Sequence, residues 1–109
     1  MRETEIEEQF KKKVREYGGR AYKFVSPGNA GVPDRLVVLP GGKIGFVELK
    51  APGKTSRKDQ QFQQRILEDL GCYVAVVDNT DIIDQVIREI TEHTTDDILR
   101  SILEAGGLV

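Results

Sequence analysis

Two short apolar runs separated by a tight turn constrain the fold of this chain more than any other feature. Residues 31–39 read GVPDRLVVL and residues 44–50 read IGFVELK, with Pro-Gly-Gly at 40–42 between them. β-Branched and aliphatic runs on either side of turn residues predict two antiparallel strands. Because side chains alternate along a strand, we expect Glu48 and Lys50 on one face of this hairpin.

Three charged side chains are predicted to meet at one end of the hairpin. Asp34 opens the first strand, and pairing across the turn brings it toward the end where Glu48 and Lys50 emerge. Charged groups among apolar residues are costly to bury without a purpose. Two carboxylates with room for water suit Mg²⁺ or Mn²⁺, and the lysine can hold a water or a phosphate oxygen beside the metal.

The motifs around these three residues resemble the VRR-NUC (virus-type replication-repair nuclease) branch of the PD-(D/E)XK nucleases. Pro33-Asp34 precedes Glu48-Leu49-Lys50 by thirteen residues, as in the general signature of that superfamily. The fuller resemblance adds KFVSPG at 23–28, GVPDR at 31–35, FVELKAPG at 46–53 and Gln60. It spans roughly residues 3 to 78, and it implies an αβββαβ core and metal-dependent hydrolysis of DNA.

The resemblance also implies roles for individual residues. Asp34, Glu48 and the backbone carbonyl of Leu49 would bind Mg²⁺, for which Mn²⁺ would substitute. Lys50 would orient or help deprotonate a water, or stabilise the transition state. Gln60 would position Lys50 or the substrate. A glutamate on the first helix would hold the metal or its water shell, and Glu7 is the first choice, with Glu3 as the alternate.

Simpler interpretations compete with these roles. The glutamates of the first helix also favour a helix N-terminus through its dipole. Arg35, directly after Asp34, would satisfy that carboxylate if the two formed an ion pair. Glu48 and Lys50 would by themselves form an ordinary surface ion pair, which contributes little to stability. The motifs around them favour the metal site.

Two further groups of residues are candidates for contact with nucleic acid. The loop 26–31, SPGNAG, is too rich in Gly and Pro for regular structure, and its backbone amides can approach a phosphate closely. A plain connector is the alternative. The predicted contacts are Lys23, Ser26 and Asn29 near this loop, and Lys54, Arg57 and Lys58 after the hairpin.

Helical periodicity fills most of the remaining chain. Residues 3–17 predict a helix with one apolar stripe, which comprises Ile6, Phe10, Val14 and Tyr17. A strand is expected at 20–25. A second helix should begin in a capping box from Ser56 to Asp59 and end at Gly71, with Phe62, Ile66, Leu67 and Leu70 directed inward.

The C-terminal part predicts one more strand and additional helices. Residues 72–77, CYVAVV, form a continuous apolar run, as expected for a strand covered on both faces. Asp78 or Asn79 should cap a helix, and Thr94 or Thr95 should start another. The expected fold class is therefore α/β: a restriction-endonuclease-like mixed sheet flanked by helices, with extra C-terminal helices whose apolar stripes pack on the core or on a second subunit.

Composition limits the other possibilities. A length of 109 residues predicts a single domain, 1–109. The resemblance implies that it is a nuclease domain with a core at about 3–78 and an extension at 79–109. Cys72 is the one cysteine and should be buried, and His93, the one histidine, should lie at a solvated helix end. No run is apolar enough for a membrane helix, which favours the cytoplasm of a bacterial or phage-infected cell.

The net charge of −2 is divided unevenly along the chain. Residues 1–65 hold 14 basic and 8 acidic side chains, a balance of +6, and residues 66–109 hold 2 and 10, a balance of −8. A basic half can bind a phosphate backbone on an acidic protein, although ordinary solvated helix charge would look the same.

These observations predict a homodimeric, structure-selective endonuclease for branched DNA, foremost four-way (Holliday) junctions, in DNA repair. Stand-alone members of the VRR-NUC branch resemble junction resolvases, and a two-fold dimer would supply two active sites for two symmetric cuts. The alternatives are a nuclease of another specificity, restriction-type or RNA-directed, and a non-catalytic nucleic-acid-binding module. No membrane and no small-molecule cofactor are expected to take part.

Overall fold

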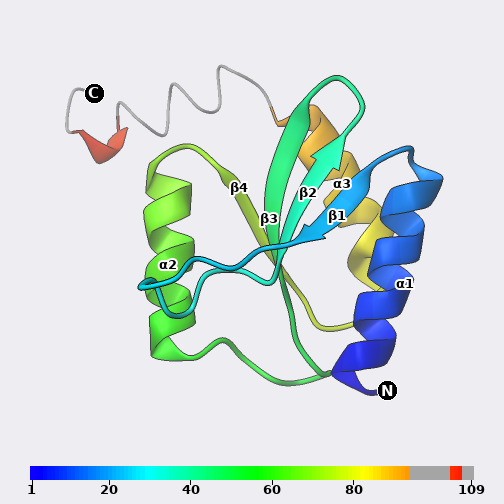
Figure 1. Cartoon of the computed structure of the whole chain (residues 1–109), viewed down its shortest axis with the longest axis horizontal. Helices are drawn as coiled ribbons and strands as arrows, with labels where there is room; N and C mark the ends of the chain where they lie inside the picture. The colour runs from blue at the N-terminus through cyan, green and yellow to red at the C-terminus, as the bar shows by residue number, and fades with distance from the viewer. Residues whose placement is uncertain (94–103, 107–109) are drawn as a thin grey trace.

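A mixed sheet with helices on both of its faces organises the chain (Figure 1). The computed structural model describes residues 1–93 and 104–106. Its elements are, in order, α1 (Glu3–Glu16), β1 (Arg20–Lys23), β2 (Arg35–Leu39), β3 (Lys43–Leu49), α2 (Lys58–Asp69), β4 (Tyr73–Val77), the 3-10 helix η1 (Thr80–Ile82) and α3 (Ile83–Glu92). No helix within the described residues is long and apolar enough to cross a bilayer.

The sheet has the strand order β1-β2-β3-β4. β1, β2 and β3 pair antiparallel, and the turn at 40–42 joins β2 to β3 as predicted. β4 pairs parallel to β3, so α2 is the crossover that returns the chain to the same end of the sheet. The predicted order of helix, three strands, helix and strand is confirmed.

The hydrophobic core lies between one face of the sheet and the helices α1 and α3. From α1 it takes Ile6, Phe10 and Val14, which are fully buried. α3 adds four buried aliphatic side chains, and the inward residues of β2, β3 and β4 complete the cluster. α3 therefore belongs to the core rather than to an appended extension. Tyr17, the fourth residue of the predicted stripe, is by contrast exposed and lies outside the core.

The prediction that α2 directs its apolar residues inward is wrong for three of the four, because only Leu67 is half-buried. Phe62 is 64% exposed, Ile66 38% and Leu70 63%, whereas Gln60 is the one residue of this helix that is buried. The apolar stripe of α2 therefore points away from the sheet. In Figure 1, α2 stands apart on the side of the sheet opposite to α1 and α3.

Three local predictions also need correction. β1 ends at Lys23 rather than at Val25. β4 is an edge strand, so Val76 is 36% exposed and Cys72 is only partly buried. The strand was expected to be covered on both faces because its sequence is apolar throughout, but α2 covers its outer face incompletely.

The end of the described core is tied back to the sheet. Asn79 caps η1 by accepting a hydrogen bond from the Asp81 amide, as one of the two predicted caps. The His93 ring nitrogen lies 2.8 Å from the carbonyl oxygen of Gly71, so the predicted solvated histidine is instead partly buried. The predicted helix from Thr94 or Thr95 falls mostly at 94–103, outside the described residues.

Candidate active site

The end of β3 brings Asp34 and Glu48 together, as the hairpin register predicts. Asp34 directly precedes β2, and its Oδ2 accepts a hydrogen bond of 2.8 Å from the backbone N–H of Leu49. This bond takes the place of a ladder bond at the point where the paired strands separate. It fixes the Asp34 carboxylate against the peptide that follows Glu48.

Glu48 is a buried carboxylate held by two donors. Its residue is 1% exposed, and its Oε2 accepts a hydrogen bond of 2.6 Å from the Gln60 side-chain amide. The Lys50 Nζ lies 3.5 Å from the same oxygen, which confirms that Glu48 and Lys50 share a face. An ordinary surface ion pair is therefore excluded as the explanation of Glu48 and Lys50, because both side chains are almost fully buried.

The second carboxylate oxygen of Glu48 is the strongest indication of function at this site. Glu48 Oε1 is buried and has no hydrogen-bond partner among the described residues. Burial, with the nearby Asp34 carboxylate, raises the pKa of Glu48 from 4.5 to about 7 despite the neighbouring Lys50 ammonium. An unpaired buried carboxylate oxygen is costly, so this arrangement indicates a place prepared for a cation or a proton.

Gln60 is oriented by hydrogen bonds at both ends of its amide. Its Oε1 accepts a bond of 2.9 Å from the Arg57 amide, which caps α2, and its Nε2 is thereby directed to Glu48. Among the described residues the Gln60 amide therefore bonds to Glu48, and the expectation that Gln60 positions Lys50 or the substrate stays a prediction. The predicted capping box from Ser56 to Asp59 is also displaced by one residue, to Arg57 and Gln60.

Gly31 places the first turn of α2 against the loop that precedes Asp34. Gly31 has a φ of +91°, and a Cβ on it would lie 2.6 Å from the Asp59 carbonyl carbon and 2.9 Å from the Gln60 amide nitrogen. Only glycine permits both this backbone conformation and this approach. The loop and Gln60 therefore form one packed unit beside Glu48.

We expect Gly31→Ala to lower both stability and activity. The added methyl group must push the first turn of α2 away, which lengthens the bond from Gln60 to Glu48. The expected loss is about 3 kcal/mol in the free energy of unfolding, combining φ strain with the clash. Urea denaturation and a cleavage assay measure the two effects.

Gly28→Ala is the matched control for that variant. Gly28 also has a positive φ, +84°, but a Cβ there meets no atom within 4 Å. It should therefore show only the backbone cost of about 1–2 kcal/mol and keep its activity. Equal losses in the two variants would contradict the role given to the Gly31 contact.

Glu7 does not join the two acids. Its Oε2 pairs with the Arg35 guanidinium at 3.3 Å, and Arg35 also donates to the Ala21 carbonyl. Arg35 therefore pairs with Glu7 rather than with Asp34, because alternation along β2 sends Arg35 and Asp34 to opposite faces. Glu3, the alternate, is exposed at the start of α1.

The predicted nucleic-acid contacts lie in, or at the edges of, the loops that follow β1 and β3. Asn29 donates to the Ser26 hydroxyl at 2.9 Å, so these two residues close the turn between them. Lys23 is exposed at the end of β1, opposite Arg35 in the register. Lys54 and Lys58 are exposed on the other side, while Arg57 pairs with Asp59 at 3.2 Å.

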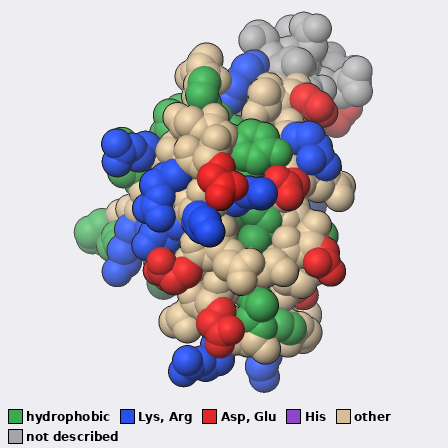
Figure 2. Space-filling view, turned by 90° about the vertical axis from the view of Figure 1, so that its right-hand side faces the viewer, with side chains coloured by type: hydrophobic (Ala, Val, Ile, Leu, Met, Phe, Trp, Pro, Cys, Tyr) green, Lys and Arg blue, Asp and Glu red, His purple; other side chains and the backbone are tan. Residues whose placement is uncertain are grey.

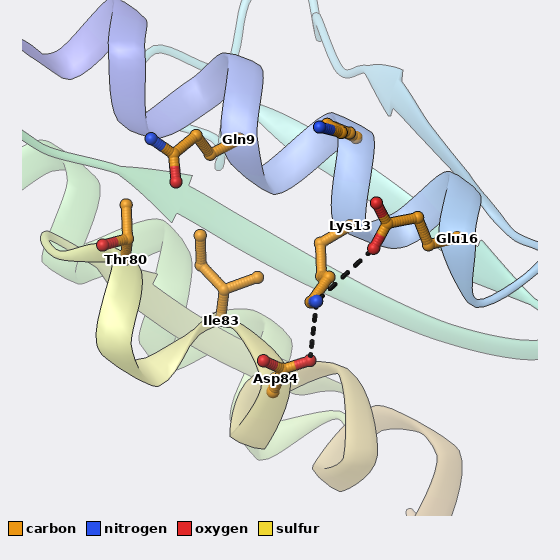
Figure 3. Close-up of a pocket in the computed structure, with 7 residues that line it drawn as sticks. Gln9, Lys13, Glu16, Thr80, Ile83 and Asp84 are labelled. Carbon is orange, nitrogen blue, oxygen red and sulfur yellow. Dashed lines mark ion pairs between the residues drawn. The ribbon is translucent and has the colours of Figure 1, made fainter.

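A separate polar hollow of about 440 Å³ lies between α1 and the region of η1 and α3 (Figure 3). Lys13 bridges Glu16 at 3.4 Å and Asp84 at 3.7 Å across it, and the Tyr17 hydroxyl donates to Asp84. These contacts join two helices at the surface, and the carboxylates disfavour a phosphate there. We interpret this hollow as structural.

The residues at the end of β3 fit a divalent cation of the oxygen-binding kind. They offer the free oxygen of Glu48, the Asp34 carboxylate and the adjoining peptide of Leu49, which are the ligand types that Mg²⁺ and Mn²⁺ prefer. No three His, Cys, Asp or Glu side chains cluster as a metal site in the described ranges. Water or a phosphate oxygen would complete the coordination of such a cation, as is common for Mg²⁺.

Comparison with known proteins decides the family. No protein-family profile matches the chain. It is 52% identical over 82 residues to "Putative nuclease p44" of Acyrthosiphon pisum secondary endosymbiont phage 1, covering 75% of this chain and 88% of the relative. A solved structure described as "VRR_NUC domain" is 30% identical, has a TM-score of 0.73 and is covered over 94% of its length, or 79% of this chain. The chain belongs to the VRR-NUC family.

Membership confirms the resemblance read from the motifs. The mixed sheet of this VRR-NUC chain, flanked by helices, is the restriction-endonuclease-like fold that was predicted. The arrangement of Asp34, Glu48 and Lys50 at one end of β3 is thus found in the fold in which it was expected.

Two parts of the site in this VRR-NUC chain were not found by sequence analysis. The pairing of Glu7 with Arg35 joins residues 28 positions apart in sequence, and no local pattern signals it. The contact of Gly31 with α2 had a signal, because a glycine immediately before Val-Pro-Asp suggests a close backbone approach. The sequence could not say which element approaches it.

Proposed function

We propose that this chain is a divalent-metal-dependent endonuclease that hydrolyses phosphodiester bonds in DNA. The observation that carries the proposal is the buried, unpartnered Oε1 of Glu48 beside Asp34 and Lys50. The VRR-NUC family and the nuclease name of the phage relative support hydrolysis of nucleic acid as the reaction class.

Each residue of the site has a proposed task. Asp34, Glu48 Oε1 and the Leu49 carbonyl hold Mg²⁺ or Mn²⁺, and Glu7 contributes through the water shell. Such an ion, when bound, lowers the pKa of a bound water and offsets charge on the phosphate. Lys50 orients that water or stabilises the charge that develops on the phosphate oxygens. Gln60 fixes Glu48 Oε2, so that Oε1 remains the free oxygen.

The distribution of basic side chains supports a DNA backbone as the ligand. Figure 2 views the side of the molecule that carries α1 and shows Lys and Arg side chains gathered most densely along one side of it. Exposed basic residues of α1 and β1 that form no ion pair in the described part of the chain are Lys12, Arg15, Arg20 and Lys23. Of these, Lys23 lies at the end of β1 that pairs beside Asp34, and Lys54 and Lys58 follow β3, so these three place positive charge close to the site.

We assign branched DNA, foremost the four-way junction, as the preferred substrate of a homodimer acting in DNA repair. A chain of this size presents little surface, and two copies related by a two-fold axis present two sites to a symmetric junction. The phage relative supports action in the cytoplasm of an infected bacterial cell. We assign no small-molecule cofactor and no membrane to this reaction.

The proposal is tested with Asp34→Asn. Asparagine keeps an oxygen that can accept the Leu49 N–H but removes the charge that binds the cation. Wild-type protein should cut a four-way junction faster than a matched linear duplex, and only with Mg²⁺ or Mn²⁺ present. The variant should cut about 10³-fold more slowly, in keeping with the loss of one electrostatic contact to the transition state.

Further substrates and controls separate the alternatives. A panel that includes RNA and unmodified linear DNA identifies a nuclease of another specificity. Asp81→Asn makes the same chemical change at an exposed residue of η1 and should retain the cleavage rate within a fewfold. Binding of DNA by both proteins without cleavage by either would overturn the enzyme in favour of a binding module.

A further inference from the structure

The outward stripe of α2 is an apolar surface that the fold leaves without a partner among the described residues. Phe62, Ile66 and Leu70 recur at intervals of four along this helix and are 64%, 38% and 63% exposed. Toward the sheet, α2 instead presents the buried Gln60 and half-buried residues that include Gln63 and Gln64. A helix whose apolar stripe faces outward has the pattern of one that packs against another molecule.

We propose that the α2 stripe, Phe62, Ile66 and Leu70, is the surface on which a second copy of this chain docks, with the two α2 helices antiparallel across a two-fold axis. This proposal rests on the homodimer of the proposed function and specifies which surface of the chain forms the dimer. The stripe is symmetric about Ile66, so the axis places Ile66 against its own counterpart. Phe62 of each copy then lies against Leu70 of the other.

Charge at the edges of the stripe fits this pairing. Arg65 and Asp69 form an ion pair at 2.9 Å beside the stripe, and Glu68 is exposed next to them. In the antiparallel arrangement, Arg65 of one copy comes beside Asp69 of the other, so opposite charges meet twice around the axis. A DNA backbone is a poor occupant of the same surface, because Glu68 and Asp69 would repel its phosphates.

A groove next to the stripe enlarges the interface. The three stripe residues expose roughly 300 Å² per copy, which is less than the roughly 800 Å² per partner of a stable complex. Leu70 also lines a groove of about 520 Å³ whose other walls include Ile44, Phe46 and Tyr73. Ile44 is 50% exposed in it. The antiparallel pairing brings Phe62 of the second copy to the mouth of this groove.

The proposed dimer fixes the distance between the two active sites. Gln60, which holds Glu48, lies six residues from Ile66, and therefore about 9 Å from the axis along the helix. With helices about 9 Å apart, the two Gln60 Cα atoms are about 20 Å apart. That separation is comparable to the diameter of a DNA duplex, so both sites can reach two strands of one branched substrate.

The first test uses a cysteine on the axis. In a Cys72→Ala background, Ile66→Cys places one thiol against its own counterpart, with a Cα–Cα separation of about 5 Å that suits a disulfide. Mild oxidation should convert most of the chain to a covalent dimer. Gln61→Cys in the same background lies on another side of α2 and should give little covalent dimer. Equal yields from the two positions would overturn the proposal.

The second test measures assembly without nucleic acid, so its outcome does not depend on catalysis. Sedimentation of Phe62→Glu at 10–100 μM should show at least a tenfold weaker dimer than wild type, because a charge in the stripe must lose its water on docking. Tyr22→Glu changes an equally exposed aromatic residue on the opposite edge strand and should sediment like wild type. Circular dichroism confirms that each variant is folded.

The outcomes of these experiments test the α2 dimer surface and the proposed function separately. A wild-type dimer that Phe62→Glu leaves intact overturns the α2 surface and keeps the homodimer. A strictly monomeric wild type overturns both, and the nuclease proposal is then judged from Asp34→Asn alone. A monomeric Phe62→Glu should still cut DNA but lose simultaneous cleavage of two strands of a junction.

Discussion

Lys50→Ala is expected to lower the rate of DNA cleavage about 10³-fold while leaving DNA binding within a fewfold of wild type. The Lys50 ammonium is almost fully buried beside Glu48, where a charge acts with little screening. Alanine removes the one ammonium at this end of the sheet that contacts the acids, among the described residues. Single-turnover cleavage and fluorescence anisotropy in EDTA measure the two quantities.

Lys54→Ala is the matched control for this prediction. Lys54 lies four residues later in the exposed loop after β3, and its amide closes a turn with the Ala51 carbonyl. Its side chain should affect binding through the phosphate backbone, with a dependence on salt, and leave the cleavage step unchanged. If Lys50→Ala weakened binding as much as it slowed cleavage, its role would be that of a phosphate contact only.

Glu48→Gln should make the metal-free protein more stable at alkaline pH, although it removes a carboxylate of the proposed metal site. The pKa of Glu48 is raised to about 7 in the folded chain against 4.5 for an ordinary glutamate. Between these two values the folded state holds a proton that the unfolded state has lost. The wild-type free energy of unfolding therefore falls as pH rises from 4.5 to 7. Glutamine carries no such proton and removes this dependence.

Urea denaturation in EDTA at pH 5 and pH 8 measures the effect. The difference in stability between wild type and Glu48→Gln should change by about 2–3 kcal/mol across this interval, because each pKa unit is about 1.4 kcal/mol. Addition of Mg²⁺ at pH 8 should then restore stability to wild type and not to the variant. Glu92→Gln, an exposed position at the end of α3, should show the wild-type dependence on pH. Parallel pH curves for wild type and Glu48→Gln would rule out the buried proton.

Local sequence patterns predicted the parts of the fold that depend on neighbouring residues. The stripe of Ile6, Phe10 and Val14 in α1 follows the helical period, and the hairpin follows from apolar runs around Pro-Gly-Gly. The shared face of Glu48 and Lys50 follows from alternation along one strand. In each case the geometry is set within a few residues, so the pattern determines it.

The same reasoning failed for α2 because periodicity shows that a stripe exists and not what it faces. Phe62, Ile66 and Leu70 have the spacing of a core helix, yet β4 is an edge strand and the core lies on the other face of the sheet. In α2 the residue buried toward the sheet is the polar Gln60 rather than an apolar residue. Its bond with Glu48 is a satisfied polar contact, which offsets the cost of burying both groups.

Contacts between distant elements were also beyond prediction. Arg35 pairs with Glu7 rather than with Asp34 because its face of β2 packs against α1. Which face does so is determined by the packing of the whole sheet. The position of α2 against Gly31 depends on the crossover between β3 and β4 in the same way. Motif spacing could therefore identify the residues of the site but not the residues that they contact.

The bond between Asp34 and the Leu49 N–H makes one acid of the site part of the hydrogen bonding of the sheet. A side chain without an acceptor oxygen at position 34 leaves a backbone donor unpaired at the strand end, with a penalty of about 1–3 kcal/mol. Chains that lose cleavage through such a change should also accumulate poorly in cells, because their folded population declines. In a screen for inactive variants, aliphatic replacements at this position would consequently be recovered less often than asparagine.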